Sequence, residues 1–212
     1  MDKMRYIIKY MKTGSWDQLR NAFKIEAEAA GLMGDFVKDN KAHFDKAVAV
    51  LADAPRIGAS GCGHTGIACR HFAHLMCCIE RPARFISPAE AVHGAAGFLQ
   101  KNDVMLLASR GGKTAELMPI IKICKQRGVV VIGLTENASS PLAAEADIFL
   151  PIKITRETDK YNTQGTTSFI VMCAVFDALQ AALIEETGFK NETFALIHPG
   201  GAVGERLKEK QC

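Results

Sequence analysis

Apolar residues follow two different rhythms along this chain, and the change comes near Pro55. Between about residues 16 and 51 they recur every three or four positions, as in Phe44, Val48 and Leu51. This spacing is typical of amphipathic helices, so we expect two helices at the start. After Pro55, short apolar runs alternate with longer amphipathic stretches, which is the rhythm of alternating strands and helices.

The short apolar runs predict five strands, at residues 56–60, 83–86, 103–108, 129–135 and 148–150. The amphipathic stretches predict helices at residues 65–79, 114–127 and 166–186. Runs such as VMLLA and VVVIGL have the continuous apolar character of strands buried on both faces. Together they predict an α/β fold, in which helices cover both sides of a parallel sheet.

The most apolar long stretch, residues 168–184, contains Asp177 and Gln180. We therefore interpret it as a buried helix rather than a membrane span, and expect no membrane partner. Near the N-terminus, the apolar pair Ile7 and Ile8 is flanked by basic residues, so no signal peptide is predicted.

Composition fits one ordinary domain: 212 residues, of which 48% are hydrophobic and 23% charged. We assign residues 1–212 to one domain, with N-terminal helices over about 1–53 and a ligand-binding core over about 54–212. A net charge of +3 from scattered basic residues does not indicate nucleic acid. Seven cysteines, an odd number without C-x-x-C spacing, indicate reduced thiols in a cytoplasmic protein.

Two turns rich in small residues follow predicted strands: GASGCGHTG at residues 58–66 and ASRGGKT at residues 108–114. Glycine allows close approach of the backbone to a ligand, and hydroxyl groups donate hydrogen bonds. The helix after each turn would direct its free N–H groups and positive dipole end to the same place. The two turns therefore predict a pocket for a small phosphorylated molecule.

Two nucleotide motifs fail at these turns, so no cofactor is expected. Gly61, Gly63 and Gly66 satisfy G-x-G-x-x-G, but the second strand ends at Ser87 without the acidic residue that binds a ribose. GKT at residues 112–114 resembles a P-loop, yet Leu107 occupies the place of its first glycine. A lone phosphate group remains the best candidate for the ligand.

Three further motifs carry a resemblance to a known family: HPGGAVGERL at residues 198–207, PAEAVHG at 88–94 and the spacing of GFKNETFALIHPGG. Over residues 26–207 the chain resembles the sugar isomerase (SIS) domain family, and within it the arabinose-5-phosphate isomerases. The resemblance implies a three-layer α-β-α sandwich around a five-stranded parallel sheet. It also implies a homo-oligomer, dimer or tetramer, with sites near subunit interfaces. Many relatives carry a pair of CBS domains, and with the chain ending at Cys212 we expect no regulation through them.

The resemblance further implies a reaction, the exchange of ribulose 5-phosphate and arabinose 5-phosphate through an enediol. Such chemistry needs a base, a group that shuttles protons and an anchor for the phosphate. The acid/base candidates that the motifs identify are Glu157, His198, Glu116 and His93. We expect them to meet at the carboxyl ends of the strands.

Each acid/base candidate has a structural alternative. Glu116 is favoured by a helix dipole alone. Glu157, beside Arg156 and Lys160, is also explained by a surface ion pair. His198 has a strand cap or turn as its alternative, although the length of the surrounding match favours a site role. His93, in a loop beside Gly94, is explained equally well by its place in that loop.

The candidate ligands of the sugar phosphate lie in the two turns and at the start of the last long helix. They are Gly63, His64, Thr65, Ser109, Arg110, Gly112, Lys113, Thr114, Thr166, Thr167 and Ser168. His64 stands where the family usually has lysine, and Lys113 adds a cation to the second turn. Relative to the family pattern, positive charge has either moved from the first turn to the second, or the protein has lost catalysis or changed its substrate. The alternative function is therefore a phosphosugar-binding or sensing protein without catalysis.

Histidines also permit a metal hypothesis. His71 and His74 lie three residues apart, and we interpret them as ordinary helix residues because no further ligand has matching spacing. A site formed by His64, His93 and His198 is a minor alternative, and no metal is expected.

Overall fold

The computed structural model describes residues 14–209 and places one parallel sheet at the centre, in the strand order β2-β1-β3-β4-β5. Each neighbouring pair of strands is parallel. All five predicted strands are confirmed, with one end of each shifted by one residue. The strands are β1 (Ile57–Ser60), β2 (Ala83–Phe85), β3 (Val104–Ala108), β4 (Val130–Thr135) and β5 (Ile148–Pro151).

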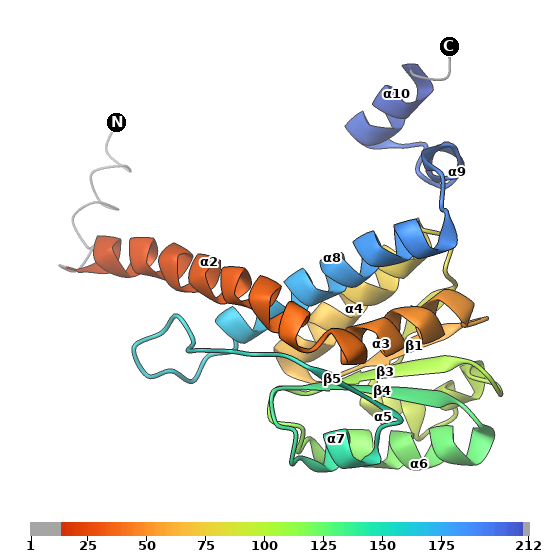
Figure 1. Cartoon of the computed structure of the whole chain (residues 1–212), viewed down its shortest axis with the longest axis horizontal. Helices are drawn as coiled ribbons and strands as arrows, with labels where there is room; N and C mark the ends of the chain where they lie inside the picture. The colour runs from red at the N-terminus through yellow and green to blue at the C-terminus, as the bar shows by residue number, and fades with distance from the viewer. Residues whose placement is uncertain (1–13, 210–212) are drawn as a thin grey trace.

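Helices cover both faces of the sheet, which confirms the three-layer sandwich (Figure 1). One layer contains α2 (Ser15–Asp39), α3 (Lys41–Asp53), α4 (Gly63–Cys78) and α8 (Thr167–Thr187), and the other contains α5 (Pro88–Ala91), α6 (Met118–Arg127) and α7 (Pro141–Glu145). Each layer has its own apolar core. Successive strand residues alternate between the cores: Leu106 and Ile132 belong to the first, Met105 and Val131 to the second.

Helix α8 is long and apolar enough to cross a membrane, and within residues 14–209 it is the one helix that meets this criterion. It packs on α2, α3 and α4, and eight of its residues are buried, among them Val171, Phe176 and Leu183. Such packing supports the interpretation of α8 as a core helix. The core helix of a globular domain can be as long and as apolar as a membrane-spanning helix.

The shorter helices were not expected from the sequence. Three of them, α5, α7 and α9 (Asn191–Ile197), have fewer than eight residues, too few for helical periodicity to show. The fourth, α10, is Gly201–Glu209. The helix predicted at 114–127 begins as the 3₁₀ turns of η2 (Ala115–Leu117), and α6 continues it from Met118. A second 3₁₀ segment, η1, is Ala95–Phe98.

Some expectations lie outside the described residues. These are the absence of a signal peptide, the first part of the N-terminal segment 1–53, and the thiol of Cys212. The six other cysteines are free thiols.

Parallel strands bring the two small-residue turns to the same edge of the sheet, because both turns follow strand carboxyl ends. The first turn packs closely onto α4: a Cβ atom added at Gly66 would lie 2.6 Å from the backbone oxygen of Gly61. One added at Gly61 would lie 3.1 Å from the carbonyl oxygen of Ala108, at the end of β3. Glycine at these positions lets α4 and β3 approach the turn.

We expect Gly66→Ala to lower the free energy of unfolding by about 1–3 kcal/mol, because the new methyl group meets a backbone oxygen that cannot rotate away. Gly31→Ala in α2 is the matched control, since a Cβ atom there meets nothing within 4 Å. It should raise the free energy by about 0.5–1 kcal/mol through helix propensity. Urea denaturation measures both, and equal effects would contradict the close packing at Gly66.

Candidate functional site

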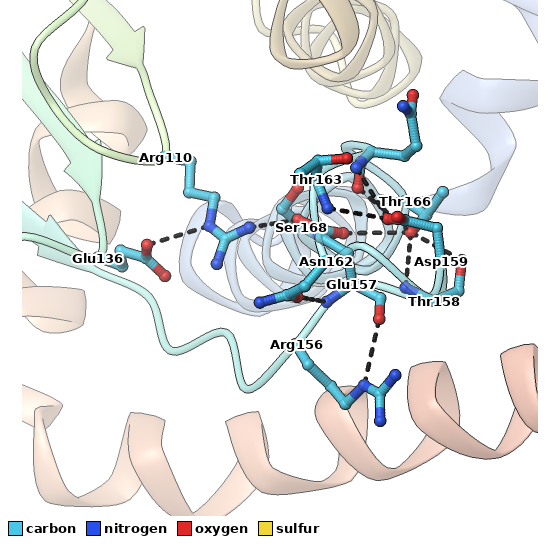
Figure 2. Close-up of polar contacts among 11 residues, drawn as sticks. Arg110, Glu136, Arg156, Glu157, Thr158, Asp159, Asn162, Thr163, Thr166 and Ser168 are labelled. Carbon is cyan, nitrogen blue, oxygen red and sulfur yellow. Dashed lines mark hydrogen bonds and ion pairs between the residues drawn. The ribbon is translucent and has the colours of Figure 1, made fainter.

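The carboxylate of Glu157 lies at the centre of a polar network between β5 and α8 (Figure 2). Its side chain is 1% exposed. One oxygen, Oε2, accepts hydrogen bonds from the backbone N–H of Ser168 at 3.1 Å and from the hydroxyl of Thr166 at 3.2 Å. The other, Oε1, accepts from Nη1 of Arg110 at 2.5 Å. Glu157 is therefore a buried anion held by donors from two separate segments.

This environment favours the ionised form of Glu157. Burial raises the pKa of the carboxyl, but the hydrogen bonds from Ser168 and Thr166 and the charge of Arg110 outweigh burial and hold the pKa below its usual range. The first turn of α8, which supplies the N–H of Ser168, also adds the positive end of the helix dipole. At neutral pH the site consequently holds a carboxylate that can accept a proton.

The loop that carries Glu157 is ordered by its own side chains. Asp159 accepts backbone hydrogen bonds from Tyr161, Thr163 and Gln164 at 2.9–3.0 Å. These bonds, from Gln164 above all, lower the pKa of Asp159. Beside Asp159, the hydroxyl of Thr158 donates to the hydroxyl of Thr166 at 2.9 Å. A long polar loop thus presents Glu157 in one defined position.

The turn after β3 is ordered by its hydroxyl groups. The hydroxyls of Ser109 and Thr114 lie 2.8 Å apart, and Ser109 Oγ also accepts the N–H of Gly112 at 3.1 Å. Gly112 has φ +65°, and a Cβ atom there would lie 2.1 Å from Oγ of Ser140. Lys113 is exposed and forms no ion pair with any residue in the range 14–209. Its charge is available to an anion.

His64 lies close to the loop of Glu157 although it belongs to the first turn of α4. Its ring centroid is 6.3 Å from that of Phe169, in an edge-on arrangement. A Cβ atom added at Gly165 would lie 3.0 Å from Nδ1 of His64. His64 is exposed, so its ring is accessible from solvent at the junction of α4 and α8.

A cleft of about 430 Å³ opens on the other side of the first turn. Glu116 lies on its wall together with Cys62, Gly63, Arg70 and Ser87. Burial, and next the charge of Glu116, raise the pKa of the Cys62 thiol, which keeps it neutral. Glu116 itself is exposed and lies in η2 rather than in a regular helix.

The structure gathers one group of predicted residues and separates others. Glu157, Thr166, Ser168 and Arg110 are in direct contact. Thr167 is fully buried, and its hydroxyl has no hydrogen-bond partner among the described residues. In this conformation a ligand cannot reach the Thr167 hydroxyl. The residues of the two turns lie at the same edge of the sheet: Gly63, His64, Thr65, Ser109, Gly112, Lys113 and Thr114.

His198 does not join Glu157 within one chain, contrary to the expectation that the acid/base candidates meet at the strand ends. It follows α9, beyond the far end of α8 (Figure 1). The 21 residues of α8 span about 30 Å. His198 instead lines a hollow of about 380 Å³ with Phe194, His74 and Cys78.

His93 is exposed at the end of α5 and is not among the residues that line the cleft of Glu116. His71 pairs with Asp177 at 2.9 Å, and His74 lies 3.6 Å from the Cys78 sulfur. No group of three or more potential metal ligands occurs among residues 14–209. The site of His64, His93 and His198 considered from the sequence therefore does not form within one chain.

One interpretation of the sequence needs correction. Glu157 is not part of a surface ion pair with Arg156 or Lys160: Nε of Arg156 donates to its backbone oxygen at 3.3 Å, while the carboxylate is buried. Arg110, predicted from the sequence to bind substrate, contacts two carboxylates in this structure, because its Nε also donates to Oε1 of Glu136 at 3.0 Å. Glu136 was missed, although its place directly after β4 puts it at the same edge of the sheet as the turns.

Comparison with known proteins places the chain among sugar isomerase domains. A family model described as SIS domain matches residues 50–182. An arabinose 5-phosphate isomerase of Pseudomonas aeruginosa is 38% identical over 158 residues, 74% of this chain and 48% of that protein. One from Escherichia coli is 36% identical over 148 residues, 70% of this chain and 47% of that protein. The chain thus spans about half the length of the curated relatives it matches.

Solved structures agree with the fold over their whole length. A crystal structure of a proposed sugar-phosphate isomerase from Listeria monocytogenes has a TM-score of 0.83 at 37% identity, with 90% of this chain and 100% of that chain covered. A protein of Escherichia coli CFT073, solved in complex with a phosphosugar, has a TM-score of 0.80 at 28% identity, with 89% of this chain and 100% of that chain covered.

The lowered pKa of Glu157 predicts a pH-dependent contribution to stability. Because the pKa is lower in the folded chain, the contribution is present above the unfolded value of about 4.3 and is lost as pH falls through the folded value. We expect Glu157→Gln to cost about 1–3 kcal/mol at pH 7 and progressively less toward pH 3, by urea denaturation. Glu145→Gln, at an exposed ion pair with Lys125, is the control and should change stability much less. A cost for Glu157→Gln that does not vary with pH would contradict the ionised state.

Proposed function

This chain belongs to the SIS domain family, and we propose that it is a sugar-phosphate isomerase that interconverts ribulose 5-phosphate and arabinose 5-phosphate through an enediol. The observation that carries the proposal is the buried, ionised carboxylate of Glu157, held at the edge of the sheet where two phosphate-type turns lie. The names of the relatives in the comparison support the same reaction.

Glu157 is the proposed base. Isomerisation moves a proton between C1 and C2, so the base must be ionised before the reaction and must not rotate away from the carbon. The contacts with Ser168, Thr166 and Arg110 meet both needs. Glu116, on the wall of the neighbouring cleft, is a further acid/base candidate and would contact hydroxyl groups of the sugar.

The turn after β3 is the proposed phosphate anchor. The hydroxyls of Ser109 and Thr114 and the cation of Lys113 supply hydrogen bonds and charge. From the first turn, His64, Thr65 and the backbone of Gly63 would close the anchor at the start of α4. This arrangement needs no cofactor.

His198 is proposed to reach the site from a second copy of the chain, because within one chain it lies beyond the far end of α8. His93, exposed in the turn after α5, is a second candidate for such a role. Exposed apolar side chains near both ends of the chain support a homo-oligomer: Trp16 is 68% and Phe23 76% exposed on α2, and Leu196 78% on α9. We further propose a cytoplasmic location, from the use of cysteine.

A phosphosugar-binding protein without catalysis is the second candidate. The observation that favours it is His64, which stands where the family resemblance predicts lysine. Loss of that cation would leave binding through Lys113 and the hydroxyl groups but change how the sugar is held.

We expect deuterium to enter C1 or C2 of arabinose 5-phosphate in D2O, with formation of the ketose, when the protein is added. Glu157→Gln should lower kcat by about 100-fold or more and leave binding of the sugar phosphate within about threefold, because it removes the base and keeps the shape. Proton NMR measures exchange and line broadening in one sample. Lys125→Gln, on the opposite layer from α8, is the control and should retain full activity. Binding by the native protein without exchange would favour the sensing function instead.

Subunit sharing predicts complementation between two inactive variants. Glu157→Gln and His198→Ala should each be nearly inactive alone. After unfolding and refolding together, a dimer with shared sites should regain about a quarter of the native activity, since mixed pairs contain one site with both residues intact. Separately refolded variants, mixed afterwards, serve as the control. Activity no higher than this control would contradict a shared site.

A further inference from the structure

We propose that Arg110 is a positioning residue, which holds the Glu157 carboxylate in place from the turn after β3, and that Glu136 fixes Arg110 in turn. The inference deepens the proposed function and rests on it, because Glu157 is there the base. It also changes the role of Arg110, which the sequence placed among the ligands of the substrate.

The guanidinium of Arg110 joins two carboxylates from different parts of the chain (Figure 2). Its Nη1 donates to Glu157 at 2.5 Å, and its Nε donates to Glu136 at 3.0 Å. Bonds from two different nitrogens of a planar group fix its rotation as well as its position. Arg110 is therefore oriented toward the base and not free to follow a phosphate group.

The two carboxylates that Arg110 contacts differ in how deeply they are buried. The side chain of Glu157 is 1% exposed and that of Glu136 is 30% exposed. Removal of the cation would leave a buried carboxylate without a counter-charge, which is far more costly than the loss of a surface pair. The main electrostatic task of Arg110 is thus to compensate Glu157, while Glu136 holds the other side of the guanidinium.

No other cation replaces Arg110 at the carboxylate in the part of the chain that the structure describes. Arg156, on the same loop, donates to the backbone oxygen of Glu157 and not to its side chain. Asp159 is engaged by backbone N–H groups of its own loop. His64 lies against Gly165 and Phe169 at the start of α8.

The backbone of Arg110 is itself fixed to the end of β4. Its carbonyl oxygen accepts the hydroxyl of Thr135 at 2.8 Å and the N–H of Glu136 at 3.1 Å. Arg110 also lies next to Ser109, whose hydroxyl belongs to the proposed phosphate anchor. The anchor and the base are consequently joined through one residue, so their separation is set by the turn.

Two substitutions and a control test this role. Arg110→Gln removes the charge, Arg110→Lys keeps the charge without the planar fork, and Lys125→Gln removes a remote exposed ion pair on the other layer. The first readout is the pH titration of the Glu157 carboxyl by ¹³C NMR, assigned by comparison with Glu157→Gln. The second is kcat and KM for arabinose 5-phosphate as functions of pH.

We expect Arg110→Gln to shift the titration of Glu157 to higher pH, because an opposite charge and a hydrogen bond to the ionised form are lost. The acid limb of kcat should move to higher pH with it. At neutral pH, kcat should fall by about 10- to 100-fold through loss of alignment, with KM changed by less than about threefold. Arg110→Lys should recover part of both, and Lys125→Gln should leave both unchanged.

The opposite pattern would overturn the inference. An unchanged titration of Glu157, with KM raised by about tenfold or more at constant kcat, would identify Arg110 as a phosphate ligand. The NMR titration needs no turnover, so a native protein that fails to isomerise sugar phosphates would contradict the proposed function separately. Arg110→Lys and Glu136→Gln both keep a cation beside Glu157, so they serve as replacements if Arg110→Gln does not fold. The titration of Glu157 is then measured in these two variants. If it does not shift to higher pH in either, the positioning role is contradicted.

Discussion

A carboxylate that is withdrawn from water must be compensated, and the compensation of Glu157 organises this edge of the molecule. The donors come from the start of α8 and from the turn after β3, which are far apart in sequence. Glu136, after β4, completes the arrangement from a third segment. The segments meet because every strand of the sheet runs in the same direction, so all the connecting loops emerge together. One ion pair thereby fixes the loop, the turn and the first turn of a helix relative to one another.

The balance of forces at Glu157 is compatible with both its contribution to stability and its proposed role in proton transfer. Burial alone would favour the neutral acid, which is a poor proton acceptor. Hydrogen bonds to the ionised form reverse this preference and at the same time restrict rotation of the carboxylate. The same contacts restrict Arg110: a guanidinium that is bonded to two carboxylates is better placed to hold the proposed base than to follow a mobile ligand. Lys113, exposed in the same turn, is better suited to contact an incoming anion.

The spacing of apolar residues predicted the strands and the long helices, because burial requires a different spacing of apolar residues in a strand and in a helix. The runs VMLLA and VVVIGL lie in the two cores as expected for strands covered on both faces. Helices α5, α7 and α9 are shorter than two full periods, so no pattern distinguished them from loops. At the candidate site, the family resemblance pointed to Glu157, and the small-residue pattern pointed to the hydroxyl-bearing turn. It did not identify the partner of Glu157, because Arg110 lies 47 positions away and only the strand order brings the two together.

The length of α8 limits which residues a single chain can bring together. Glu157 is tied to the first turn of α8, and His198 follows the segment that comes after the last turn of that helix. Helix α8 is about 30 Å long, and α9 lies beyond its far end rather than back along it (Figure 1). With this placement of α9, the two residues can take part in one reaction only if they come from different copies. The exposed Trp16 and Phe23 on α2 and Leu196 on α9 are apolar surface whose burial would favour such an assembly.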